Sequence, residues 1–188
     1  MLNSIVGLLN GGVPAVPNSY ESIATAVGTG SSNTITFTSI PSTYKHLQLR
    51  GIVKSTTAGS SFSSVGLNFN TDTSSSYTRH LLWGDGSTPY AYGQTSAGTT
   101  WYIGANDFPS AGYTSIVGAH IVDILDYTNT NKNKTVRALT GCDVNGAGEV
   151  ALSSTVYLKT NAITSIELVS ASGNFSTLTQ YALYGIKG

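Results

Sequence analysis

Residues 34–38 read Thr-Ile-Thr-Phe-Thr, and residues 46–50 read His-Leu-Gln-Leu-Arg. In both stretches an apolar side chain stands at every second position, the period of a β-strand that is buried on one face and solvated on the other. The same alternation continues from Tyr20 onward. It covers residues 65–70, 78–83, 99–103, 114–125, 134–142, 149–158, 162–171 and 178–186. These runs predict a fold made of β-strands.

The segments between the runs are rich in Gly, Asn, Ser and Asp, which are residues that favour turns. They are residues 28–33, 72–76, 84–87, 129–133, 145–148 and 172–174. Gly and Asn tolerate positive φ, while Ser and Asp close local hydrogen bonds. Short strands joined by such turns predict antiparallel sheets. A total of eight to ten strands favours a jelly roll over an immunoglobulin sandwich. We therefore expect an all-β, antiparallel jelly-roll-type β-sandwich over residues 20–188, preceded by a short N-terminal arm.

The arm, residues 1–19, combines a short amphipathic segment with a Gly/Pro tether. Its apolar residues recur at i, i+3, i+4 and i+7, the spacing of one helical face, and a Gly-Gly pair ends the pattern. A helix of ten residues is marginal alone in water, so this segment needs a surface to lie against. Two interpretations stay open: the arm packs on its own domain, or it docks on a partner subunit. The predicted partner-binding residues are Leu2, Ile5, Val6, Leu9, Pro14 and Pro17.

Charged residues are scarce, at 10% of the chain, and nine basic residues balance nine acidic ones, while Ser and Thr make up roughly a quarter. The outward positions of the predicted strands therefore carry hydroxyls where an average soluble protein carries charges. Such faces can be buried against a neighbour without the desolvation cost of charges. The zero net charge offers no field for nucleic acid, and no run of about 20 apolar residues offers a membrane helix. We expect a structural building block that binds neither nucleic acid nor membrane.

The residues that usually carry chemistry do not form a recognisable site. Cys142 is the only cysteine, which excludes an internal disulfide and a Cys–Cys zinc site. His46, His80 and His120 lie in separate strand-like runs and are expected to be half-exposed. Residues 143–148 superficially resemble a calcium loop, but Ala147 stands where a ligand is needed, and a hairpin turn explains them better. The sequence predicts no catalytic residue, no metal and no cofactor.

An aromatic stretch over residues 83–102 is the richest candidate for a contact surface. Aromatic rings with hydroxyl and carboxylate neighbours can stack on sugars or anchor protein partners. Rings that cap the open end of a sandwich are the ordinary alternative, which the sequence favours, with protein contact next and glycan third. The candidate contact residues are Trp83, Asp85, Tyr90, Tyr92, Trp101 and Tyr102.

Two segments carry a family resemblance. Residues 36–50 (Thr-Phe-Thr-Ser-Ile-Pro-Ser-Thr-Tyr-Lys-His-Leu-Gln-Leu-Arg) form the first, and the second runs from Ile-Thr-Ser-Ile at 163–166 through Gly-Asn-Phe at 173–175 to Leu-Tyr-Gly-Ile-Lys at 183–187. Together they resemble small jelly-roll structural proteins of tailed bacteriophage virions, which are head decoration (cement) proteins and tail-fibre modules. The resemblance implies a non-enzymatic virion component, a homotrimer, and no catalytic residues.

Three functions are consistent with the sequence and the resemblance. In the first, which we favour, the chain is a capsid decoration protein: residues 1–17 grip the major capsid protein and the sandwich lies over junctions between capsomers. In the second, it is a tail-fibre or receptor-binding module whose residues 83–102 contact host-surface glycan. In the third, it is an enzyme that depolymerises polysaccharide with Asp85. The expected partner is the major capsid protein or another virion protein, and the expected location is the virion, assembled in the host cytoplasm.

Overall fold

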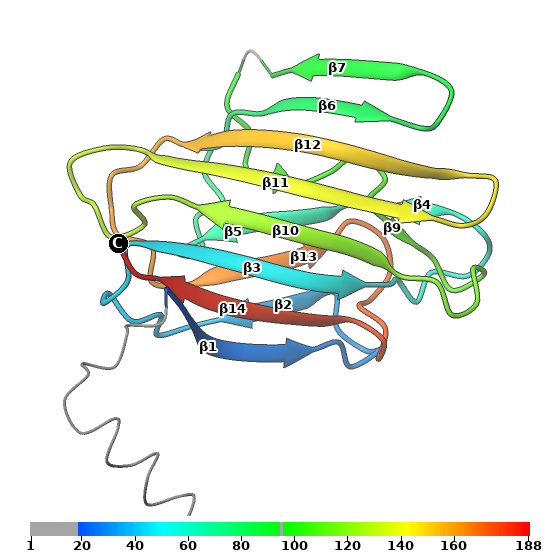
Figure 1. Cartoon of the computed structure of the whole chain (residues 1–188), viewed down its shortest axis with the longest axis horizontal. Helices are drawn as coiled ribbons and strands as arrows, with labels where there is room; N and C mark the ends of the chain where they lie inside the picture. The colour runs from blue at the N-terminus through cyan, green and yellow to red at the C-terminus, as the bar shows by residue number, and fades with distance from the viewer. Residues whose placement is uncertain (1–18, 95) are drawn as a thin grey trace, which may run out of the picture.

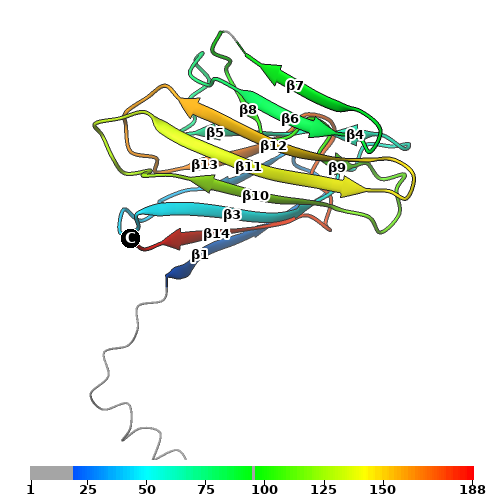
Figure 2. The same ribbon diagram turned by 45° about the horizontal axis from the view of Figure 1, so that its top comes forward.

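The structure is a computed structural model that describes residues 19–94 and 96–188 (Figures 1 and 2). Over these residues it contains strands, turns and loops but no helix. In chain order the strands are β1 Tyr20–Val27, β2 Thr34–Phe37, β3 His46–Val53, β4 Phe62–Ser63, β5 Val65–Phe69, β6 His80–Gly84, β7 Pro89–Gly93, β8 Trp101–Tyr102, β9 Phe108–Pro109, β10 Gly118–Ile124, β11 Lys134–Asp143, β12 Gly148–Tyr157, β13 Ile166–Ser170 and β14 Gln180–Ile186. The prediction of an all-β fold is confirmed.

The strands form two layers. The large sheet has eight strands in the order β1-β14-β3-β10-β11-β12-β6-β7, and the smaller sheet has four in the order β2-β13-β5-β8. A further short pair joins β4 to β9, and the strand pairs are antiparallel. Figure 1 looks onto the outer face of the large sheet, with β7 and β1 at its two edges and the small sheet behind it. The fold is therefore β-sandwich-like.

The strand pairing is nested from the ends of the chain inward. β1 pairs with β14, β2 with β13, β3 with β10, and β5 with β8. Two hairpins interrupt this series: β6–β7 is inserted between β5 and β8, and β11–β12 between β10 and β13. Both hairpins add to the same edge of the large sheet. This sheet is therefore twice as wide as the one that it faces.

The core lies between the two layers and follows the predicted alternation. Along β11, Val136 and Ala138 are buried while Arg137 and Leu139 are exposed, because successive side chains of a strand point to opposite faces. Both sheets contribute aliphatic side chains to one continuous cluster, which aromatic rings complete. Its fully buried members include Leu47, Leu49, Leu67, Phe69, Val122, Ile124, Val136, Ile166, Leu168, Tyr181 and Leu183.

The observed strands correct the predicted set in number. The described residues hold fourteen strands, not eight to ten, because β1, β4, β7 and β9 are additional to the ten strands that the alternating runs predict. β7 begins with Pro89 and ends with Gly93, both of which weaken a strand prediction. Proline is tolerated there because it is the first residue of an edge strand. The residues predicted for arm binding, Leu2 to Pro17 in the sequence, lie outside the described residues.

The hairpin prediction for residues 143–148 is confirmed. Val144 N donates to Ala147 O at 2.9 Å, and the two residues between them, Asn145 and Gly146, have φ of 60° and 116°. Two central residues with positive φ define the tight turn that matches the twist of a β-hairpin, and Asn-Gly is its preferred sequence. The turn joins β11 to β12 and brings one end of this hairpin close to the β6–β7 turn.

Candidate functional site

The outer face of the large sheet carries a row of aliphatic side chains that crosses several strands. Ile121 of β10 pairs with Leu139 of β11, and Leu139 pairs with Leu152 of β12. Leu152 pairs in turn with Leu82 of β6, which pairs with Ala91 of β7. Residues in register on adjacent strands point to the same face about 4.8 Å apart. Five consecutive strands therefore present a continuous apolar row.

A second apolar row runs beside the first, two residues further along each strand. It passes from Ile52 of β3 through Ala119 and Gly141 to Val150 of β12 and Gly84 of β6. The large members of the two rows are 39% to 59% exposed, so no described part of the chain covers them. We call these six residues the apolar band: Ile52, Leu82, Ile121, Leu139, Val150 and Leu152.

Polar side chains border the apolar band on one side. On β10 and β11 the next outward positions are Asp123 and Arg137, which form an ion pair at 2.7 Å. Gln48 of β3 donates a hydrogen bond from its side-chain amide to Asp123 at 2.7 Å. These three side chains bond to one another through the ion pair and the hydrogen bond. They mark the edge of the uncharged aliphatic surface.

The aromatic stretch predicted from the sequence is only partly brought together. Trp83 of β6 and Tyr90 of β7 lie in register and stack, with ring centroids 4.9 Å apart and planes at 16°. The Tyr90 hydroxyl donates to Oδ2 of Asp85 at 3.2 Å. Oδ1 of Asp85 accepts from the backbone N–H groups of Thr88 and Ser87 at 2.8 and 2.9 Å. These backbone hydrogen bonds, first that from Thr88, hold the pKa of Asp85 well below its ordinary value.

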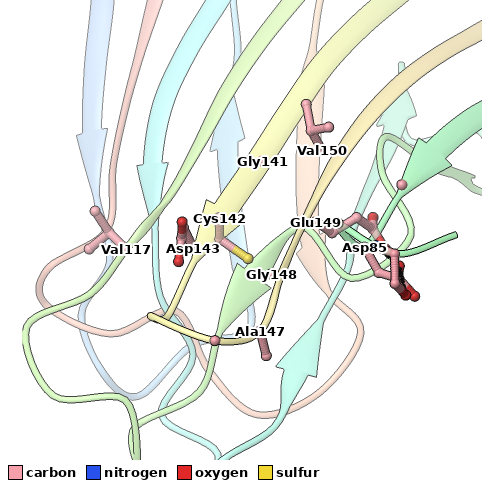
Figure 3. Close-up of a pocket in the computed structure, with 13 residues that line it drawn as sticks. Asp85, Val117, Gly141, Cys142, Asp143, Ala147, Gly148, Glu149 and Val150 are labelled. Atoms are coloured by element: carbon pink, nitrogen blue, oxygen red, sulfur yellow. Dashed lines mark hydrogen bonds between the residues drawn. The ribbon is translucent and has the colours of Figure 1, made fainter. Parts of the chain in front are cut away.

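Two open clefts are lined by Asp85, and the smaller one is lined by the aromatic pair as well. One, of about 1010 Å³, lies between the β6–β7 turn and the β11–β12 turn, and its lining includes Asp85, Cys142 and Glu149 (Figure 3). The other, of about 510 Å³, is lined by the same Asp85 and Glu149 together with both rings, Phe62 and Asn106. An anionic carboxylate beside stacked rings in an open cleft is suited to binding a polyhydroxylated ligand.

The other polar groups of the clefts are engaged in structure. One oxygen of Glu149 accepts the backbone N–H groups of Ala105 and Asn106 at 3.2 and 3.0 Å, which fixes that loop against β12. The Cys142 thiol donates to the backbone oxygen of Asn106 at 3.6 Å. Burial raises the pKa of Cys142 to about 12, so the reactive thiolate is scarce near neutral pH. Neither group is arranged as a nucleophile or a general base.

The remaining aromatic candidates lie elsewhere. The prediction that Trp101 is a contact residue is wrong, because its side chain is fully buried and its indole N–H donates to Ser153 Oγ at 3.0 Å. Tyr92 and Tyr102 are exposed, but neither lines the two clefts. The Arg79 guanidinium lies 5.8 Å from the centre of the Tyr92 ring. Of the six candidates the structure therefore joins Trp83, Asp85 and Tyr90.

A buried polar network was missed by the sequence analysis. His120 is buried, which corrects the expectation of a half-exposed side chain. Its Nδ1 is 2.7 Å from the Tyr181 hydroxyl, and its Nε2 is 3.1 Å from the backbone oxygen of Asp107 and 3.4 Å from Oδ2. Burial raises the pKa of Asp107 to about 8 and lowers that of His120 to about 4. The sequence carried a signal of this burial. His120 lies two and four residues before the core residues Val122 and Ile124, and therefore on the same face of β10.

No protein-family model matches the chain, and no curated protein matches it. Among residues 19–94 and 96–188, no helix is long and apolar enough to cross a membrane. Over the same ranges, no three His, Cys, Asp or Glu side chains are grouped as metal ligands would be.

Proposed function

We propose that this chain is a non-enzymatic structural protein of a phage virion, a capsid decoration protein that stabilises the head by binding the major capsid protein. The observation that carries the proposal is the apolar band. A contiguous, half-exposed aliphatic surface of this size, on the order of 500 Å², is comparable to the largest apolar patch of a typical monomer, and such patches are often functional. A partner protein that covers it removes the band from water, which is the main driving force of protein association.

The strand pairing supports a jelly-roll fold within this proposal. Leaving out the two inserted hairpins and the short β4–β9 pair, the eight remaining strands pair first with last, second with seventh, third with sixth and fourth with fifth. This is the pattern of a long hairpin that is folded and rolled into two sheets, the double Greek key of a jelly roll. The resemblance to phage structural proteins implies the same fold, and the proposed assembly is a homotrimer.

The polar groups support a structural role over a catalytic one. In the described residues, the raised pKa of Cys142 keeps its thiol protonated, and the imidazole of His120 is buried. The exposed Asp85 carboxylate has a strongly lowered pKa, which makes it a poor proton donor or acceptor at neutral pH. Their arrangement stabilises loops and turns.

Copy number and location in purified particles test the proposal. We expect the protein to occur on heads in proportion to the major capsid protein, and expect Leu139→Asp to be lost from heads because it places a charge in the apolar band. Thr135→Asp is the matched control, since Thr135 is exposed on the same face of the same strand. Deletion of residues 1–17 tests the predicted arm in the same assay. Normal head occupancy by Leu139→Asp would contradict the proposed role of the band.

A second function, a tail-fibre or receptor-binding module that contacts host-surface glycan, is favoured by the stacked Trp83–Tyr90 pair beside Asp85. In that case the copy number follows that of the tail. Trp83→Ala then lowers adsorption of particles to host cells without changing the copy number, because it removes one stacking surface. Tyr102→Ala, an exposed aromatic residue outside the clefts, is the control. Unchanged adsorption of the Trp83→Ala particles rejects this alternative.

A further inference from the structure

We propose that the outer edge of β7 pairs with the same edge of a second copy of this chain, across a two-fold axis. This inference deepens the proposed function and rests on its interpretation of the apolar band as a protein-contact surface. β7 is the last strand of the large sheet, and its outer edge is open in Figure 1. A strand at the edge of a sheet presents backbone N–H and C=O groups that can pair with another strand.

The register with β6 determines which backbone groups β7 directs outward. Gln94, just beyond β7, donates its N–H to Arg79 O at 2.8 Å. Along an antiparallel pair, such bonding positions alternate with positions whose backbone groups point away from the partner strand. The even-numbered residues of β7 therefore bond to β6. The odd-numbered residues Pro89, Ala91 and Gly93 direct their backbone groups outward.

These three outward positions are symmetric about Ala91. When two β7 strands run antiparallel around a two-fold axis, Ala91 faces Ala91 of the second copy, and Pro89 faces Gly93. Each Ala91 N–H donates to the other Ala91 carbonyl, and each Gly93 N–H donates to the facing Pro89 carbonyl, which gives four backbone hydrogen bonds. Proline has no N–H, but it stands at the ends of the paired segment. The edge is complementary to itself, as a two-fold contact requires.

The tyrosine side chains of β7 fit the same arrangement. Between the bonding positions, Tyr90 of each copy faces Tyr92 of the other in a non-hydrogen-bonded pair, where Cα atoms lie about 4.5 Å apart. The two side chains are 40% and 48% exposed in the single chain. Aromatic cross-strand pairs stabilise sheets. Two-fold pairing therefore forms two such pairs, which extend the Trp83–Tyr90 stack of each copy.

The opposite edge of the large sheet is protected against pairing, whereas the β7 edge is not. The register of β1 shifts between Ser22 and Ala24, as at a β-bulge, and the strand carries the charged Glu21. Bulges and charges are devices by which proteins block edge-to-edge pairing. β7 pairs with β6 at five successive positions without a shift, contains no charged residue, and is exposed along its whole length. These differences single out β7 as the edge that accepts a strand.

The contact also enlarges the surface that the proposed function uses. Its axis stands perpendicular to the sheet, so the outer faces of both copies point the same way, and the apolar row that ends at Ala91 continues into the second copy. One band offers on the order of 500 Å². A standard interface takes roughly 800 Å² from each partner. Two joined bands exceed this area, which favours paired copies as the form that binds the major capsid protein.

The two-fold contact is compatible with the proposed homotrimer. An isologous contact joins two copies and does not by itself build a ring of three. In an assembly of trimers, it therefore connects a copy of one trimer to a copy of the neighbouring trimer. It leaves every apolar band uncovered and available to the major capsid protein.

Charges introduced at residue 91 test the contact with purified protein, because only a two-fold contact places this residue opposite itself. We expect Ala91→Lys and Ala91→Glu each to reduce the molar mass to half or less of that of the unmodified chain, down to 19.5 kDa for a monomer. Like charges then face each other across the axis. An equimolar mixture of the two variants should restore the larger species. Sedimentation velocity over a concentration series measures these masses.

A control and a second variant separate edge pairing from damage to the fold. Thr25→Lys places the same charge at an exposed position of the opposite edge strand, and should leave the molar mass unchanged. Ala91→Pro removes an N–H that β6 does not use, so we expect it to lose the contact as well. Melting temperatures equal to that of Thr25→Lys show that the variants fold.

Three results would overturn the proposal. Equal molar masses of the unmodified chain and Ala91→Lys would show that the β7 edges do not pair. Variants that each lose mass but do not recombine on mixing would show that β7 contacts a different surface of the second copy. Loss of mass in Thr25→Lys would place the contact at the β1 edge. None of these measurements involves heads, so failure of the contact is distinguishable from failure of the proposed function, which head occupancy by Leu139→Asp tests.

Discussion

Asp107 and His120 give the folded chain a predictable response to pH. The pKa of Asp107 is raised to about 8 from 3.8 by burial, so between these values the folded chain holds a proton that the unfolded chain has released. Its contribution to stability therefore falls as pH rises. His120, lowered to about 4 from 6.5, contributes a rise in stability between those values. Between about pH 4 and 6.5 the two effects on stability cancel. Above pH 6.5 only Asp107 acts, and it lowers stability until about pH 8.

We expect Asp107→Asn to remove the loss of unfolding free energy between pH 6.5 and 8, which should be about 1 kcal/mol per pH unit in the unmodified chain. The amide oxygen of the variant can still accept the backbone N–H of Val65, which Asp107 Oδ1 accepts at 3.2 Å. Urea unfolding at pH 5, 6.5 and 8 measures the effect. Asp85→Asn, an exposed carboxylate whose pKa lies far lower, should keep the decline. A decline that persists in Asp107→Asn would contradict this assignment.

At the scale of single elements, Lys134 holds the loop between β10 and β11 in place through hydrogen bonds. Its buried ammonium donates to the backbone oxygens of Asn129, Lys132 and Thr160, the latter two at 2.9 and 2.8 Å. Lys134→Met leaves buried carbonyl groups without a donor, so we expect a loss of about 2–3 kcal/mol in unfolding free energy. Lys132→Met is the control. Lys132 is exposed in the same turn and pairs with the largely buried carboxylate of Asp126, which keeps Lys45 at 3.4 Å as a second cation, so the loss should stay below about 1 kcal/mol.

The strands themselves were largely predictable, because alternation is a local property of the sequence. Residues 134–142 alternate in the sequence, and the strand they predict is observed as β11. Alternation divides the side chains of a strand between two faces. Which of these faces points into the core depends on the register with neighbouring strands. Trp101 and Tyr102 illustrate the limit: both were predicted as contact residues, but they point to opposite faces, and only Tyr102 is exposed. β7 was missed because proline and glycine at its ends obscure the strand signal.

At the scale of the whole molecule, the apolar band could not be predicted from the sequence. Its six residues come from β3, β6, β10, β11 and β12, and each is an ordinary outward position in its own strand. They form a band only because the register places Ile121, Leu139, Leu152 and Leu82 in one row. The contacts of Tyr90 with Trp83 and Asp85 could not be predicted from the sequence either, because the β6–β7 hairpin brings these side chains together.

The composition of the apolar band predicts how its contact with a partner protein responds to salt. The apolar band contains no charged side chain, so its proposed contact with the major capsid protein depends on burial of apolar surface. Raising sodium chloride from about 0.05 to 0.5 M screens charge interactions strongly and should change the dissociation constant of the protein from heads by less than about twofold. Ammonium sulfate, which strengthens apolar burial, should tighten it. Co-sedimentation with heads over a concentration series of the protein measures both. A tenfold weakening in sodium chloride would instead indicate a charged contact, for which Arg50 and the Asp123–Arg137 pair at the border of the band are the nearest groups.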